Sequence, residues 1–184
     1  MADSKAQGGM QKVSDHDVIY ALRTVHQNQT QLNILADQKA NILIGIVAVI
    51  LTIICTNASF LASMENQVLM SFVTFLVMEM MALCFALFVI MPKTVGRSKG
   101  MTIDNMPNPL FFGFFTKFKE DEFVSYISKL MISDDAARRL LEKDMYQMGV
   151  VLNKKYMLLK AAYIFAVMGL FLLIFSMVVD VFVR

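Results

Sequence analysis

A single carboxylate lies in the middle of a long apolar stretch of this chain. Glu79 is near the centre of the apolar block 68–91, and neither this block nor the two others like it contains lysine or arginine. A charged residue at the centre of a bilayer costs about 2.5–3.5 kcal/mol on insertion scales and rarely faces lipid. Glu79 is therefore either neutral and hydrogen-bonded, with Thr52 as a candidate partner, or it lines a water-filled path. In an oligomer, it would form a ring of carboxylates that favours cations.

A second group of charges lies close to the start of two apolar blocks. Asp37 and Lys39 precede the first block, and Lys154 and Lys155 precede the third. We expect Asp37 to pair with Lys154 or Lys155, in a polar layer that couples motion of the flanking helices to the membrane spans. The alternative is a purely structural clasp, or lysines whose ammonium groups reach lipid headgroups.

Four basic residues could contact an anionic ligand such as a nucleotide. They are Arg97, Lys99, Arg138 and Arg139. The alternative is the excess of lysine and arginine that any cytoplasmic loop shows. The formal net charge of the chain is only +2, so we expect no nucleic-acid polymer as a partner.

The residue patterns of enzymes and cofactor sites are missing from the sequence. It contains no glycine-rich phosphate loop, no nucleophile elbow and no paired catalytic carboxylates. His16 and His26 are ten residues apart, which does not place them on one helical face, so we expect no metal site. We therefore expect a protein that is not an enzyme and carries no cofactor.

The elements that position these residues are three apolar blocks. They cover residues 42–62, 68–91 and 161–183, in a chain that is 57% hydrophobic and only 17% charged. About 20 helical residues cross a hydrocarbon core of about 30 Å, and in lipid only a helix satisfies its own backbone groups. The sequence predicts an all-α membrane protein of three transmembrane helices. We expect residues 1–13 to be disordered and residues 14–184 to form a single helical membrane domain.

The basic residues indicate the orientation of the three spans. The loop between the first two blocks has no lysine or arginine, whereas region 93–160 and the N-terminal segment carry many. Because cytoplasmic loops are enriched in these residues, we expect the N-terminus and region 93–160 to be cytoplasmic and the C-terminus to be outside.

Two cytoplasmic extensions are expected to continue the first and third spans as helices and to pack as a bundle. Apolar residues at alternating steps of four and three predict a coiled-coil seam on the first extension, formed by Val18, Leu22, Val25, Gln29, Leu32 and Ala36. The second extension has a matching face of Leu141, Met145, Met148, Leu152 and Tyr156. The two can pack in parallel or antiparallel, and we expect them to run in opposite chain directions.

An aromatic run lies between the two extensions. Pro107 and Pro109 interrupt regular structure before Phe111, Phe112, Phe114, Phe115 and Phe118. With Lys117 and Lys119 close by, this run could anchor at the level of the lipid headgroups. Equally, it could be a loop packed beneath its own bundle.

Three short elements of the sequence resemble a known family. The stretch 35–43, LADQKANIL, resembles the "ADxKA" signature of Pycsar-type membrane effectors, and 108–113, NPLFFG, is similar to a second element of that family. Asp144-Met145-Tyr146, followed by the run 151–159, VLNKKYMLL, is similar to a third element of that family. Order and spacing agree over about residues 20–180.

The resemblance implies a role in bacterial anti-phage defence. Effectors of this type respond to a cyclic nucleotide made during infection and impair the inner membrane. We identify no separate cyclic-nucleotide-binding domain here, so the trigger is expected to be a partner protein or a ligand that binds the cytoplasmic helices.

Three functions are compatible with the sequence. The first is an effector in the bacterial inner membrane that forms a homo-oligomer and permeabilises the bilayer when triggered. The second is a small membrane anchor or scaffold that recruits a soluble partner through its cytoplasmic helices. A transporter is disfavoured, because the chain has no inverted repeat and three spans do not divide into halves.

Overall fold

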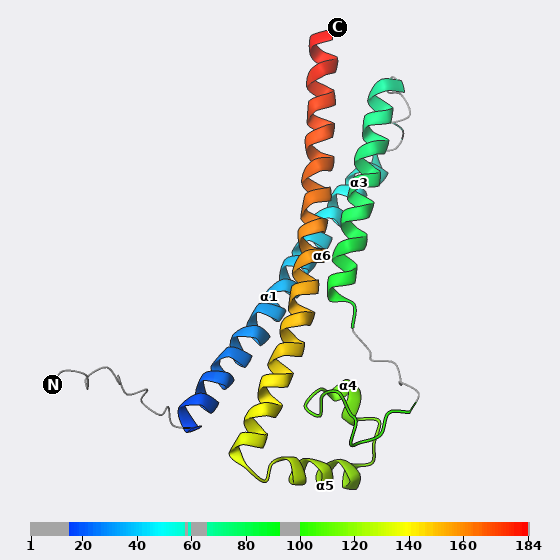
Figure 1. Ribbon diagram of the computed structural model, residues 1–184. Coiled ribbons are helices and arrows are strands. Elements are labelled where there is room, and N and C mark those ends of the chain that lie inside the picture. Colours follow the sequence, from blue (N-terminus) through cyan, green and yellow to red (C-terminus); the bar gives the residue numbers. More distant parts are fainter. Residues whose placement is uncertain (1–14, 58, 60–65, 93–99, 184) are drawn as a thin grey trace, which may run out of the picture. The chain divides into compact units, whose positions relative to one another are not determined.

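The computed structural model describes residues 15–57, 59, 66–92 and 100–183, and within these ranges all regular structure is helical. The helices are α1 (Asp15–Thr56), α3 (Asn66–Ile90), α4 (Phe112–Phe115), α5 (Glu120–Leu130) and α6 (Asp134–Val183) (Figure 1). The predicted all-α fold is confirmed. The segment expected to be disordered, 1–13, lies outside the described residues, as do Arg97 and Lys99.

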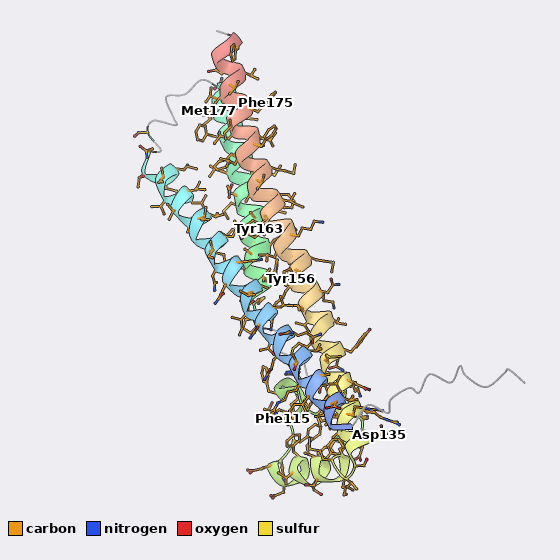
Figure 2. The ribbon with its side chains drawn as sticks, turned by 90° about the vertical axis from the view of Figure 1, so that its left-hand side faces the viewer. Phe115, Asp135, Tyr156, Tyr163, Phe175 and Met177 are labelled. Atoms are coloured by element: carbon orange, nitrogen blue, oxygen red, sulfur yellow. The ribbon has the colours of Figure 1, made fainter. Side chains whose placement is uncertain are left out.

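Three of these helices are long and apolar enough to cross a membrane. They are α1, α3 and α6, and they expose many large apolar side chains, as Figure 2 shows for Phe175 and Met177 on α6. At about 1.5 Å per residue, α1 with 42 residues is about 63 Å long and α6 with 50 residues about 75 Å long. Both exceed the hydrocarbon core of about 30 Å twofold. The protein is thus a multi-pass membrane protein whose first and third spans continue as helices outside the bilayer.

Helix α1 ends earlier than the block 42–62 suggested. The Thr56 hydroxyl and the Asn57 amide both donate to the carbonyl of Ile53, at 2.9 and 2.8 Å, and the chain turns at Asn57. A crossing of about 20 residues that ends at Thr56 begins near Asp37. For a crossing that ends there, Asp37 lies close to the edge of the hydrocarbon.

The chain groups into two compact units. The polar unit comprises Met1–Gln29 and Val95–Gln147, and the apolar unit comprises Thr30–Thr94 and Met148–Arg184. Helices α1 and α6 each contribute residues to both units, whereas α3 belongs to the apolar unit and α4 and α5 belong to the polar unit.

The core of the apolar unit is built where α1, α3 and α6 meet. Small side chains allow helices to approach closely in a membrane, and three of the seven buried core residues are alanines. The core residues are Ala40, Leu43, Val47, Ala86, Val89, Leu159 and Ala162. Around them, Phe85 stacks on Phe165 with ring centroids 5.4 Å apart. Many other large apolar residues of these three helices are exposed and face outward toward lipid.

The buried side of α1 follows a heptad pattern, but part of the predicted seam is wrong. Val25 and Leu32 are 41% and 42% exposed. The buried and half-buried row contains Leu22, His26, Gln29, Asn33, Ala36, Ala40, Leu43 and Val47. It has the expected steps of four and three, but polar residues replace the neighbouring apolar ones in its first half. The prediction placed Val25 and Leu32 in the seam because they are apolar. A pattern of apolar residues cannot predict a seam that contains polar residues.

Helices α1 and α6 run in the same chain direction within the apolar unit. Thr30 contacts Met148 and Asp37 contacts Lys155, and in both pairs the partner lies 118 positions later. A constant offset requires parallel helices, so the expectation of opposite directions is wrong. The α6 residues predicted to form the matching face are all half-buried, and one of them, Met148, makes the contact with Thr30.

The aromatic run forms a small cluster in the polar unit. Phe115 of α4 stacks on Phe123 of α5 at a centroid distance of 4.8 Å, and Phe111 packs edge-on against Phe114. Phe112 is exposed, while the other four phenylalanines of the run are half-buried. Helix α5 has three acidic residues in its first turn and Lys129 in its last, as the helix dipole favours. The run is largely used in packing within its own unit.

Candidate functional site

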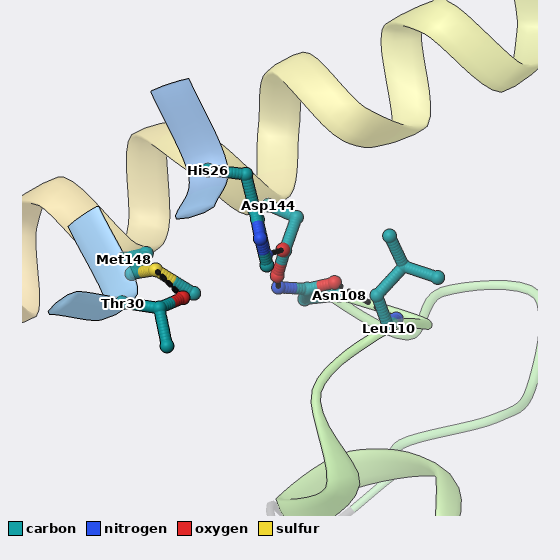
Figure 3. Close-up of polar contacts among 6 residues, drawn as sticks. All are labelled: His26, Thr30, Asn108, Leu110, Asp144 and Met148. Atoms are coloured by element: carbon teal, nitrogen blue, oxygen red, sulfur yellow. Dashed lines mark hydrogen bonds and ion pairs between the residues drawn. The ribbon is translucent and has the colours of Figure 1, made fainter. Parts of the chain in front are cut away.

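A cluster of three polar side chains ties α1, α6 and the intervening loop together in the polar unit (Figure 3). Asn108 Nδ2 donates to Asp144 Oδ1 at 2.7 Å, and His26 Nε2 lies 2.9 Å from Asp144 Oδ2. Asn108 and Asp144 are buried, and His26 is half-buried. Because both carboxylate oxygens of Asp144 are engaged, this cluster satisfies a buried charge that would otherwise be costly.

The local sequence holds Asn108 in place. Its Oδ1 accepts the backbone N–H of Leu110 at 2.9 Å, the short-range bond typical of asparagine in turns, and Pro109 lies between them. One turn along α6 from Asp144, Gln147 Nε2 donates to the carbonyl of Pro107 at 3.3 Å. No function was predicted for His26, Asn108 or Asp144 from the sequence. The signal in the sequence was that His26 lies at a heptad position of the first extension and that the second extension carries Asp144.

In the apolar unit, Asp37 and Lys155 form an ion pair. Lys155 Nζ donates to Asp37 Oδ1 at 2.6 Å and to Oδ2 at 2.9 Å. The Lys155 side chain is 11% exposed and that of Asp37 is 38% exposed. Ala36 and Ala40, which flank Asp37 on the buried side, are fully buried. Their small side chains let α6 approach closely enough for this contact.

The two other lysines predicted at this level do not share the ion pair. Lys154 and Lys39 have exposed side chains. The backbone carbonyl of Lys39 accepts a long hydrogen bond from the Tyr163 hydroxyl at 3.4 Å, and Figure 2 shows Tyr163 on α6. Of the two lysines offered by the sequence, the structure selects Lys155, because the helical phase of α6 turns Lys154 to the outside.

The intramembrane carboxylate lies against the backbone of α6. Glu79 is 2% exposed, and its Oε2 has no hydrogen-bond partner within the described part of the chain. A Cβ placed on Gly169 would lie 3.6 Å from Glu79 Oε1. Thr52, the candidate partner, is exposed and donates to the carbonyl of Ala48 at 2.8 Å on its own helix. The structure therefore does not bring Thr52 and Glu79 together.

This chain is similar to a known protein family over most of its length. The model described as the Pycsar effector protein domain matches residues 20–182. The chain belongs to the Pycsar effector family. It is accordingly a membrane effector of anti-phage defence. No curated protein and no solved structure matched the chain significantly.

The elements that carried the family resemblance supply both polar contacts of this Pycsar effector. Asp37 comes from the first element, Asn108 from the second, and Asp144 and Lys155 from the third. Within the polar unit the second and third elements meet at Asn108 and Asp144, and within the apolar unit the first and third meet at Asp37 and Lys155. The motif residues of the Pycsar effector thus join segments that are distant in the sequence.

The arginines proposed as nucleotide contacts have acidic neighbours on their own helix. Arg138 Nη2 lies 2.7 Å from Asp135 Oδ1, and Arg138 Nε lies 3.6 Å from Glu142 Oε1. Arg139 Nη2 lies 3.0 Å from Asp135 Oδ2. These local pairs reduce the positive charge that the Pycsar effector presents here. Within the described residues, no group of histidine, cysteine or acidic residues could hold a metal ion.

Proposed function

We propose that this Pycsar effector assembles into a homo-oligomer in the bacterial inner membrane and permeabilises it when triggered. In this proposal the N-terminus and region 93–160 are cytoplasmic and receive the trigger, which is a cyclic nucleotide or a defence-system partner protein. The C-terminus is outside, the lipid bilayer is the target, and no enzymatic step is needed.

The observation that carries the proposal is the buried carboxylate of Glu79. It lies in the middle of a helix of 25 residues that has no other charged residue and is long enough to span the membrane. A membrane anchor has no use for such a group, because it destabilises insertion by several kcal/mol. A permeation path does, because a ring of carboxylates contributed by several copies attracts cations and replaces part of their hydration.

The α1–α6 contacts supply the connection from trigger to membrane. His26–Asp144 lies in the polar unit, and Asp37–Lys155 lies in the apolar unit, each between the same two helices. Rigid helices with discrete side-chain contacts can transmit a displacement over their length. A ligand or partner that moves one helix relative to the other in the polar unit would therefore act on the spans.

The test is the membrane potential of cells that overproduce the protein. We expect the parent to depolarise the cells and Glu79→Gln, which removes the charge with little change in size, to lose most of this effect. Thr52→Val is the matched control, because Thr52 is an exposed polar residue on another span. If Glu79→Gln depolarises cells as strongly as the parent does, the carboxylate has no role in permeation.

A scaffold is the second candidate, favoured by exposed apolar side chains on the polar unit. Tyr20, Ile132 and Tyr146 are strongly exposed there. A scaffold would be inert when overproduced alone, whereas an effector would depolarise the membrane. The subunit number in nanodiscs, measured with and without cyclic nucleotides, tests the proposed assembly separately.

A further inference from the structure

We propose that this effector is closed within the membrane by the contact between Gly169 on α6 and the helical turn of α3 that contains Glu79. Gly169 is the positioning residue: it lets α6 lie so close to α3 that water and ions cannot reach the Glu79 carboxylate. This inference rests on the proposed function. It adds the step by which the carboxylate is withheld in the resting protein.

The two helices approach each other closely at Gly169. A Cβ at this position would lie 2.9 Å from Met78 Cβ, 3.5 Å from Phe75 Cδ2 and 3.6 Å from Glu79 Oε1. The first distance is shorter than any relaxed carbon–carbon contact. Met78 Cβ is attached directly to the backbone and cannot rotate away, so any larger residue at position 169 must push α3 and α6 apart.

Glycine is otherwise a poor choice at this place. Gly169 lies well inside a helix of 50 residues, and glycine is the weakest helix former except for proline. Gly45, the glycine of α1, shows the contrast, because a Cβ there would meet no atom of the described residues within 4 Å. The close approach of α3 therefore explains Gly169, and no comparable contact explains Gly45.

Further contacts join α3 and α6 on both sides of Gly169. Ser71 and Ser176 are hydrogen-bonded at 2.5 Å toward one end, and Phe85 stacks on Phe165 toward the other. Both contacts join α3 to α6, so the interface is continuous along the two helices. Glu79 is enclosed between them at 2% exposure, with Oε2 lacking a hydrogen-bond partner among the described residues.

A carboxylate enclosed in this way cannot serve a permeating ion. It must be hydrated to attract a cation, and water can reach it only if the packing around it opens. Separation of α3 from α6 at Gly169 is therefore the change that exposes the Glu79 carboxylate to water and ions. Because packed interfaces switch between discrete arrangements rather than deforming continuously, a small wedge at this point shifts the balance toward the open form.

The experiment measures access to Glu79 directly, independently of permeation. The full-length protein in liposomes is treated with dicyclohexylcarbodiimide, a lipid-soluble reagent for carboxyl groups, and the adduct at Glu79 is followed by mass spectrometry. We expect Gly169→Ala to increase the labelling rate roughly tenfold, because a tenfold shift toward the open form corresponds to about 1.4 kcal/mol, which lies within the usual cost of overpacking a packed interface. Glu79→Gln identifies the adduct, because it cannot form there.

Gly45→Ala is the matched control and should label at the parent's rate. If Gly169→Ala proves too unstable to purify, Ser176→Ala loosens the same interface without adding bulk and should also raise the rate. Labelling of Gly169→Ala at the parent's rate would overturn the closure, and so would an equal increase in Gly45→Ala.

The membrane potential of the same liposomes separates the two proposals. Faster labelling of Gly169→Ala without any leak of ions supports the closure and counts against the permeation function. A leak in Gly169→Ala with unchanged labelling of Glu79 overturns the closure and leaves the permeation function standing.

Discussion

Reversal of the charges in the Asp37–Lys155 pair tests the arrangement of α1 and α6 most directly. Removing one partner of a buried ion pair costs about 3–5 kcal/mol, because the other charge is left uncompensated. The Lys155 side chain is 11% exposed, but that of Asp37 is 38% exposed, so water screens part of this loss. We therefore expect Asp37→Ala to destabilise the protein by about 2–3 kcal/mol. Asp37→Asn keeps an acceptor for the ammonium group and should cost about 1 kcal/mol.

The assay is thermal unfolding of the purified protein in one detergent. For a chain of this size, each kcal/mol corresponds to about 2–4 °C, so Asp37→Ala should lower the midpoint by about 4–12 °C. Asp37→Lys should lower it further, since it places two ammonium groups together. The double variant Asp37→Lys with Lys155→Asp restores opposite charges and should recover part of the loss, with a coupling energy of about 1–2 kcal/mol.

The neighbouring Lys154 provides the control. It has the same charge and lies one position away, but its side chain is exposed, so Lys154→Asp should change stability by less than about 0.5 kcal/mol. It should also fail to rescue Asp37→Lys. If the reversed pair at position 155 gives no rescue, or if position 154 rescues equally well, the parallel register of α1 and α6 is wrong.

Three further outcomes follow from the contacts. Asn108→Ala removes a hydrogen-bond donor from the buried Asp144 carboxylate, so it should lower the free energy of unfolding, measured by thermal unfolding, by about 1–3 kcal/mol. A substitution at an exposed loop position should leave the free energy of unfolding nearly unchanged. Ser71→Ala should cost about 0.6 kcal/mol, and the double variant with Ser176→Ala should cost little more, because one hydrogen bond is lost in both. Thr52→Val should leave the depolarisation unchanged, because the Thr52 hydroxyl donates to the carbonyl of Ala48 on its own helix.

Much of the fold could be predicted because lipid imposes a local requirement. Each apolar block must satisfy its own backbone, so its length and composition suffice to predict a helix. Glu79 was found for the same reason, as a polar group conspicuous against an apolar background. The pairing partner of Asp37 was narrowed to two adjacent lysines, since both lie at the same depth.

The remaining features depend on which side of each helix faces its neighbour, and one residue of helical phase is a rotation of about 100°. That rotation makes Lys155 rather than Lys154 the partner of Asp37, and it puts His26 inside while Val25 stays exposed. Hydrophobicity could not reveal this choice, because the inward position is taken by His26, which pairs with Asp144, and not by its more apolar neighbour Val25. Chain length, composition and periodicity thus determined the helices and the membrane, whereas the tertiary contacts alone decided which polar groups meet.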